Sequence, residues 1–125
     1  MSTAQTVSAL ASQRAALTPD AATLIETDGS RVTFAAILAE AQALARGLAG
    51  LGLVKGDTIS VQLPNWRETS AINLAAAMLG LRLNPITPIY RSAELRAILA
   101  DAESRLIFIP GQFRSQDFTA TISEI

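Results

Sequence analysis

The stretch TISVQLP, residues 58–64, decides the fold because it alternates as a β-strand does and ends at a proline. A helix is predicted after it for residues 66–80, where the apolar spacing is that of a helix and the segment ends at a glycine. Two further strands are predicted at residues 81–86 and 105–109, with a helix between them. Strands and helices that alternate at this spacing predict an α/β protein, a partial doubly wound parallel sheet with flanking helices.

The residues before this stretch predict two helices and a short N-terminal hairpin. An opening helix ends shortly before the first proline of the chain. A hairpin is predicted for residues 22–33, with its turn at Asp28-Gly29. Thr33 is then expected to cap a long amphipathic helix that ends at Gly50-Leu51-Gly52, where glycine tolerates a left-handed backbone.

Helix caps are also predicted farther along the chain. Asn65 is a suitable N-cap, and Glu68 stands three residues later, where its side chain can reach back to the Asn65 amide. Ser92 is expected to cap the next helix. A last apolar stripe begins at Phe118 and is still incomplete at Ile125, so we expect the 125 residues to be a truncated piece.

Length and composition limit the classes of function. A chain of 125 residues predicts one domain, here residues 1–125 with no second domain. The net charge is −1, with basic and acidic residues interspersed, so no nucleic-acid partner is expected. There is no Cys and no His, which excludes thiolate nucleophiles, imidazole bases and the usual zinc sites. Without a signal sequence or a transmembrane segment, a cytoplasmic location is expected.

The glycines of residues 50–56 form a G-x-G pattern, but they follow a predicted helix and precede a strand. A phosphate-binding glycine loop has the opposite order, strand and then helix. We therefore interpret these glycines as a helix C-cap and a turn. Lys55, the only lysine in the chain, is interpreted as a solvated turn residue, since no Ser/Thr/Gly-rich loop precedes it.

Two loop segments follow the predicted strands, where open α/β sheets bind ligands. Trp66 and Arg67 could reach a ligand, but a packing role for Trp66 is favoured. The segment NPITPIYR, residues 84–91, presents an aromatic ring beside a guanidinium. Arg91 could bind a phosphate and Tyr90 could pack on a base, or the segment could be a rigid connector with Arg91 near Glu94.

No group of residues is spaced for catalysis. The carboxylates lie on separate predicted helices or helix ends, and no residue type is available to act as a base for Ser92. The predicted set of catalytic residues is therefore empty, as is the set of metal ligands.

The ordered set of these motifs resembles the AMP-forming acyl-CoA synthetases, of the adenylate-forming superfamily. The resemblance is carried by the turn at residues 52–57, the segment at residues 62–68, Gly80 and the NPITPIYR segment. It extends from about residue 16 to residue 118. Within the superfamily, the sequence is similar to the branch of cyclohexanecarboxylate-CoA ligase and medium- or long-chain fatty-acyl-CoA synthetases. The fold implied is the N-terminal segment of the adenylate-forming enzyme fold, and the domain is the large AMP-binding domain.

The resemblance implies a ligase of fatty acid metabolism that acts in two steps. ATP and a fatty or alicyclic carboxylic acid give an acyl-adenylate and pyrophosphate, and the CoA thiol then displaces AMP. The implied cofactors are ATP, CoA and Mg²⁺, and the implied partner is the remainder of the same enzyme chain. The family's Ser/Thr/Gly-rich loop ending Pro-Lys-Gly is absent from these 125 residues. The piece alone is therefore expected to be inactive and to bind no cofactor tightly.

Relatives can contact the nucleotide end of CoA through the segment after Asn84-Pro85 and through a later arginine. By position, the resemblance implies contacts from the following residues: Thr87, Pro88, Tyr90, Arg91 and Arg114. The alternative function is a stand-alone binding or interaction module that keeps the scaffold without catalysis. A small flavodoxin-like nucleotide binder is disfavoured, because no predicted strand ends in a phosphate loop.

Overall fold

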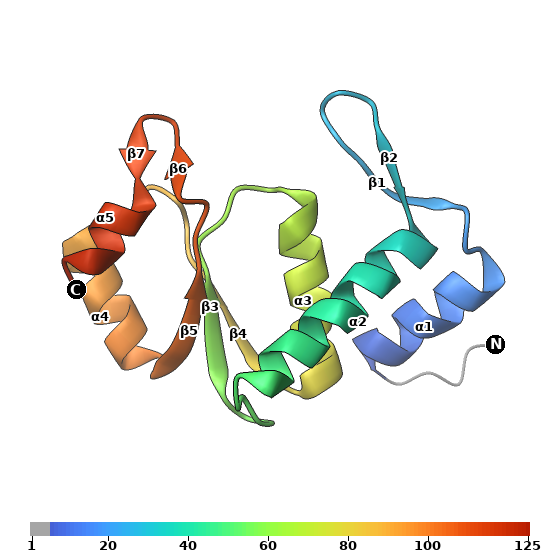
Figure 1. Ribbon diagram of the computed structural model, residues 1–125, viewed down its shortest axis with the longest axis horizontal. Helices are drawn as coiled ribbons and strands as arrows, with labels where there is room; N and C mark the ends of the chain where they lie inside the picture. The colour runs from blue at the N-terminus through green and yellow to red at the C-terminus, as the bar shows by residue number, and fades with distance from the viewer. Residues whose placement is uncertain (1–5) are drawn as a thin grey trace. The chain divides into compact units, whose positions relative to one another are not determined.

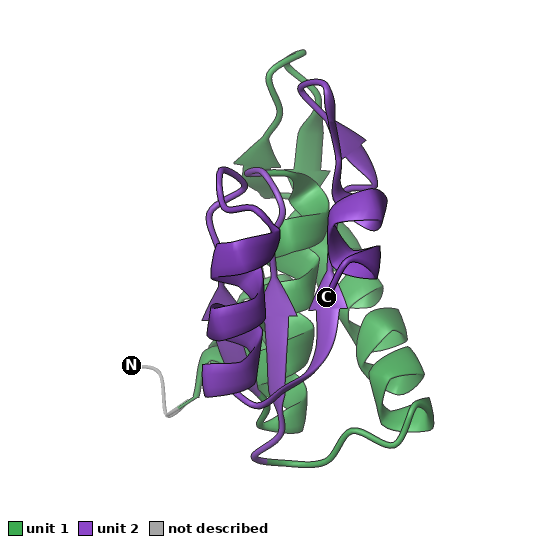
Figure 2. Cartoon of the chain, turned by 90° about the vertical axis from the view of Figure 1, so that its left-hand side faces the viewer, with its two compact units in different colours: residues 1–55, 66–81 green, residues 56–65, 82–125 purple. Residues whose placement is uncertain are grey.

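The protein, described here by a computed structural model over residues 6–125, forms two compact units. Among the described residues, unit 1 contains 6–55 and 66–81, and unit 2 contains 56–65 and 82–125 (Figure 2). Each unit is therefore assembled from two separate stretches of the chain. No helix within residues 6–125 has the length and apolar character needed to cross a membrane.

Unit 1 is a helical unit with a hairpin. Its elements are α1 (Val7–Leu17), β1 (Ala22–Ile25), β2 (Arg31–Thr33), α2 (Phe34–Gly50) and α3 (Arg67–Leu79) (Figure 1). The three helices pack on one another, and β1 pairs with β2 in antiparallel fashion. A buried cluster of Val32, Ile37 and Ala71 joins the hairpin to α2 and α3. The predicted hairpin and both predicted helices before residue 58 are confirmed.

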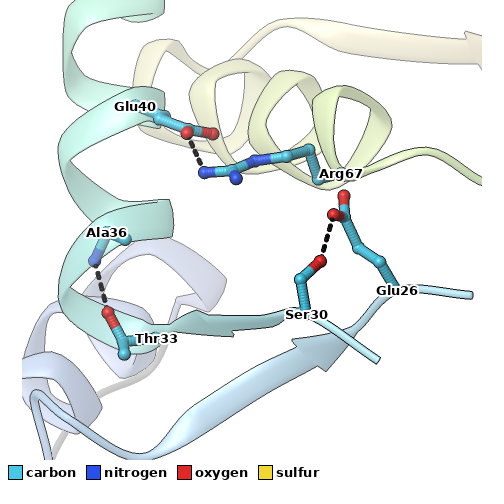
Figure 3. Close-up of polar contacts among 6 residues, drawn as sticks. All are labelled: Glu26, Ser30, Thr33, Ala36, Glu40 and Arg67. Atoms are coloured by element: carbon cyan, nitrogen blue, oxygen red, sulfur yellow. Dashed lines mark hydrogen bonds and ion pairs between the residues drawn. The ribbon is translucent and has the colours of Figure 1, made fainter. Parts of the chain in front are cut away.

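The start of α2 has the predicted cap. The Thr33 hydroxyl accepts a hydrogen bond from the Ala36 N–H at 3.1 Å, which satisfies one of the unpaired donors of the first turn (Figure 3). After α2, the chain turns through Gly52, whose φ of 93° lies in the left-handed region. The predicted C-terminal glycine of this helix is therefore confirmed, since a side chain would be strained at this φ.

Unit 2 contains a parallel sheet whose strand order is β4-β3-β5. Its elements are β3 (Thr58–Val61), β4 (Arg82–Pro85), α4 (Ser92–Asp101), β5 (Ser104–Phe108), β6 (Gln112–Phe113), β7 (Gln116–Asp117) and α5 (Phe118–Ser123) (Figure 1). Helix α4 packs on β5, and β6 pairs with β7 in a small antiparallel hairpin. The predicted α/β class and the parallel sheet are confirmed.

The three strands of this sheet are linked by a chain of side-chain hydrogen bonds. The Asn84 amide on β4 donates to the Ser60 hydroxyl on β3 at 3.0 Å, and Ser60 donates to the Ser104 hydroxyl on β5 at 2.8 Å. Ser104 in turn donates to the Leu106 carbonyl at 2.9 Å. Ser60 is fully buried, so each of these bonds keeps a polar group from being unsatisfied in the interior.

Two predicted caps are wrong by one residue. Helix α3 begins at Arg67 with Trp66 as its N-cap, and no side chain caps it, so Asn65 lies one position too early. Helix α4 has Arg91 as its N-cap rather than Ser92, and the Glu94 carboxylate accepts from the Arg91 N–H at 3.2 Å. In both cases the chain is still extended at the residue before the helix, and that geometry rather than residue type sets the cap position.

The end of α3 generates a stability prediction with an internal control. Gly80 has a φ of 68°, and a Cβ there would lie 2.9 Å from Cγ of Lys55. We expect Gly80→Ala to lower the free energy of unfolding by roughly 1–2 kcal/mol, mainly through the strained backbone, because the lysine side chain can move.

Gly47→Ala is the matched control, because Gly47 lies within α2 and a Cβ there meets no atom within 4 Å. This variant should be more stable than the natural chain by about 1 kcal/mol, owing to the helix preference of alanine. Urea denaturation followed by circular dichroism measures both changes. Equal effects of the two substitutions would contradict the assigned conformation of Gly80.

Candidate functional site

The candidate site lies at the end of the sheet that is formed by the carboxyl ends of its parallel strands. The loop of residues 86–91 follows β4, and the hairpin of β6 and β7 follows β5 (Figure 1). In open parallel sheets ligands bind at this end, because the loops that follow neighbouring strands meet there. All five residues of the predicted CoA contact belong to these two segments, and both segments belong to unit 2.

The loop after β4 is a tight turn. The Tyr90 N–H donates to the Thr87 carbonyl at 3.3 Å, which closes a four-residue turn with Pro88 at its second position. Proline favours this position because its ring fixes φ near the value that the turn requires. The turn therefore has a defined shape, and its last residue is followed at once by the N-cap of α4.

A buried glutamine on the neighbouring strand holds this turn. Gln62 follows β3 directly and is fully buried, and its backbone N–H donates to the Phe108 carbonyl of β5 at 2.9 Å. Its side-chain Nε2 donates to the Thr87 carbonyl at 3.2 Å and to the Tyr90 carbonyl at 3.1 Å. The first and last residues of the turn are thus bonded to one amide group.

Tyr90 and Arg91 are presented to solvent by this arrangement. Both residues are exposed, Tyr90 at 38% of its surface. Glu94 is engaged by the Arg91 backbone N–H, and within residues 6–125 no carboxylate forms an ion pair with the Arg91 guanidinium. A free planar guanidinium beside an aromatic ring is suited to a phosphate and a base.

Arg114 lies at the tip of the second segment. It and Ser115 have φ values of 50° and 65° and form the two-residue turn between β6 and β7. The Arg114 guanidinium lies 5.1 Å from the centre of the Phe113 ring, within the range of a cation–π contact. This contact holds an exposed positive charge in a segment that, like the one with Arg91, follows the carboxyl end of a strand.

The other predicted candidate, at the start of α3, has a structural role. The Arg67 guanidinium forms an ion pair with the Glu40 carboxylate of α2 (Figure 3). Both side chains are partly exposed, so the pair contributes at most about 1 kcal/mol of stability. The Arg67 cation is therefore already engaged within the helical unit.

The G-x-G region also behaves as the sequence indicates. Gly52 and Gly56 both have φ of 93° in the turn that leads from α2 to β3. Lys55 between them is exposed, and its methylene groups lie against Gly80. The region is a helix end and a turn, and no helix N-terminus follows it to bind a phosphate.

The two serine hydroxyls of the sheet are engaged in hydrogen bonds. Ser60 and Ser104 donate to another hydroxyl and to a carbonyl, so neither hydroxyl is paired with a base. Over the described part of the chain, no group of three or more acidic side chains could hold a metal ion. The groups exposed at this end of the sheet are the guanidinium groups of Arg91 and Arg114 and the ring of Tyr90.

Two features of the site were missed by the sequence patterns. Gln62 was interpreted only as a strand residue, although an amide side chain among the apolar residues of a strand indicates a buried polar contact. The β6 and β7 hairpin was also missed, because Arg114-Ser115 lacks the Asn-Gly or Asp-Gly signal of such turns.

Most of this chain is similar to known sequences. A profile of the family described as AMP-binding enzyme matches residues 11–124. The chain is 41% identical over 104 residues to the sulfoacetate–CoA ligase of Cupriavidus necator, which covers 82% of this chain and 20% of that protein. It is 32% identical over 102 residues to the medium-chain fatty-acid–CoA ligase of Escherichia coli, covering 82% of this chain and 18% of that protein.

Solved structures share this fold. The chain superimposes on the N-terminal domain of FACL13 from Mycobacterium tuberculosis with a TM-score of 0.78 and 30% identity, covering 83% of this chain and 26% of that one. The chain therefore spans about a fifth of the length of the curated relatives it matches, and about a quarter of this solved domain. The likeness in sequence and the likeness in fold each cover more than four fifths of the chain.

Proposed function

Because this chain belongs to the family of AMP-binding enzymes, we propose that it forms one part of an ATP-dependent carboxylate–CoA ligase. In this reaction a carboxylate oxygen attacks the α-phosphorus of ATP and pyrophosphate leaves. The CoA thiol then attacks the carbonyl carbon of the acyl-adenylate, AMP leaves and a thioester forms. The proposal is supported by the two relatives named as CoA ligases and by the match of the family profile over most of the chain.

The acid substrate is proposed only as a carboxylate. One relative is named for sulfoacetate and the other for medium-chain fatty acids, which differ in size and polarity. What these acids share is the carboxylate group that reacts with ATP. A fatty or alicyclic acid fits this class, and the residues that select the acid are assigned to the remainder of the enzyme.

Within the ligase, the part described here is proposed to contact the nucleotide end of CoA. The observation that carries this proposal is the exposed Arg91, which has no carboxylate partner among residues 6–125 and follows Tyr90 at the end of a fixed turn. The guanidinium would bind a phosphate and the tyrosine ring would pack on the adenine. Thr87 and Pro88 shape the turn, and Arg114 is the second cation at this end of the sheet.

Mg²⁺ and ATP are proposed for the complete ligase, and no step is assigned to them here. When bound, Mg²⁺ would neutralise charge on the phosphates of ATP. No cluster of acidic residues in the part that the structure describes fits such an ion. We assign the cation and the triphosphate to the remainder of the enzyme.

We expect the purified 125-residue chain to be inactive, since no catalytic group or phosphate loop is present in it. Neither exchange of labelled pyrophosphate into ATP nor formation of acyl-CoA should be detected. The complete Escherichia coli medium-chain fatty-acid–CoA ligase serves as the positive control in the same assays. Turnover by the 125-residue chain above the protein-free blank would contradict the proposal that it is only one part of the catalytic unit.

Arg91→Ala tests the CoA contact in the complete ligase. Loss of a charge-assisted hydrogen bond to a phosphate should raise the KM for CoA by about tenfold or more. The KM values for ATP and for the acid should not change, because those substrates are assigned to other residues. Steady-state kinetics with each substrate varied in turn measures the three constants.

Arg82→Ala is the matched control for this experiment. Arg82 is an exposed arginine and the first residue of β4, so it lies at the amino end of the strand whose carboxyl end leads to Arg91. Its replacement removes the same charge and should leave the KM for CoA unchanged. If both variants change this constant alike, a general charge effect explains the result and the assigned contact is wrong.

A further inference from the structure

The turn that presents Tyr90 and Arg91 is connected to the sheet through one side chain. The Gln62 Nε2 bonds the carbonyls of Thr87 and Tyr90, which are the first and last residues of the turn. Both acceptors are backbone atoms, so Gln62 sets the path of the chain directly rather than through a neighbouring side chain. The structure describes no other side-chain hydrogen bond to these two carbonyls.

Gln62 is joined to the sheet through its backbone, and its side chain is packed in the interior. Its side chain is fully buried, and its backbone N–H is bonded to Phe108 of β5 while β3 is the central strand of the sheet. A buried amide loses its bonds to water, so the two bonds to the turn are its means of satisfying the Nε2 donors. The position of the amide is therefore transmitted to the turn.

The backbone of Arg91 is fixed on the other side. Its N–H donates to the Glu94 carboxylate, and its carbonyl accepts from the Leu95 N–H at 2.8 Å as α4 begins. Tyr90 is thus bonded to the sheet and Arg91 to the helix, and the two side chains project from a backbone that is restrained at both ends. Such restraint reduces the entropic cost of binding a ligand, because less backbone freedom is lost on binding.

We propose that Gln62 is a positioning residue, which fixes the turn of residues 87–90 so that Tyr90 and Arg91 are held ready for the nucleotide end of CoA. This inference rests on the proposed function for the identity of the ligand. Its structural part, that the Gln62 amide determines the conformation around Tyr90, stands on the two hydrogen bonds alone.

Gln62→Leu is the direct test, and the structure indicates that this variant can fold. The substitution removes both bonds to the turn, but it also removes Oε1, a buried oxygen that has no hydrogen-bond partner in the described part of the chain. Removing an unsatisfied buried acceptor offsets part of the loss. Leucine also occupies a similar volume, so the interior of the sheet stays filled.

Tyr90 is the only tyrosine in the chain, which gives the experiment a specific signal. Incorporation of 3-fluorotyrosine into the 125-residue chain places a single fluorine label on the turn. In Gln62→Leu the fluorine resonance should move or broaden, because the turn is no longer held in one conformation. A resonance identical to that of the natural chain would overturn the proposal.

Ser60→Ala is the matched control. Ser60 is also fully buried and lies on the same strand, but its hydroxyl is bonded to Asn84 and Ser104 rather than to the turn. This variant should lose stability without changing the Tyr90 resonance. An equal change in both variants would overturn the proposal, since general loosening of the sheet would then explain it.

A measurement on the natural chain covers the case in which Gln62→Leu does not fold. The side-chain amide protons of Gln62 should exchange slowly with solvent and should show nuclear Overhauser effects to protons of Thr87 and Tyr90. Rapid exchange without these cross-peaks would overturn the assigned bonds.

Kinetics of the complete ligase separate this inference from the proposed function. Gln62→Leu should raise the KM for CoA about fivefold, the change expected for losing the equivalent of one net hydrogen bond, while Ser60→Ala should not. If Arg91→Ala leaves the KM for CoA unchanged, the CoA assignment fails whatever Gln62 does. If Arg91→Ala raises it and Gln62→Leu does not, the positioning role is overturned and the CoA contact stands.

Discussion

The central strand of the sheet has to satisfy the hydrogen bonds of polar side chains that it buries. Ser60 and Gln62 are both fully buried, and away from bulk solvent their donors need partners within the protein. Ser60 does so through Asn84 and Ser104 on the two neighbouring strands, and Gln62 does so through the turn after β4. One requirement therefore aligns three strands and fixes the loop that carries the candidate site.

The sequence allowed the elements of regular structure to be predicted, because their signals are local. Alternation over residues 58–63 and the glycines at positions 52 and 80 depend only on the chain near them. The caps at Asn65 and Ser92 were each predicted one residue away from the observed N-cap, since residue preference does not decide where an extended segment turns into a helix. The β6 and β7 hairpin had no local signal, because two residues other than glycine adopt left-handed conformations there.

Prediction of the site was limited in a different way. Tyr90 and Arg91 could be selected because an aromatic ring beside a guanidinium after a strand is a chemically meaningful pair. The role of Gln62 depends on a contact with residues 25 and 28 positions later, which no local pattern contains. Arg67 shows the converse: its residue type suited a ligand, and only the contact with Glu40, 27 positions earlier, shows that the charge is already paired.

The division of the chain into two units, each made of two stretches, also limits the order in which the molecule can form. Strand β3 leaves the ribosome before β4 and well before β5, yet it is the strand on which both of them pair. Until residue 108 has been made, the central strand of the sheet has at least one edge open. Unpaired strand edges are where newly made chains associate wrongly, so the chain is most exposed to wrong association during this interval.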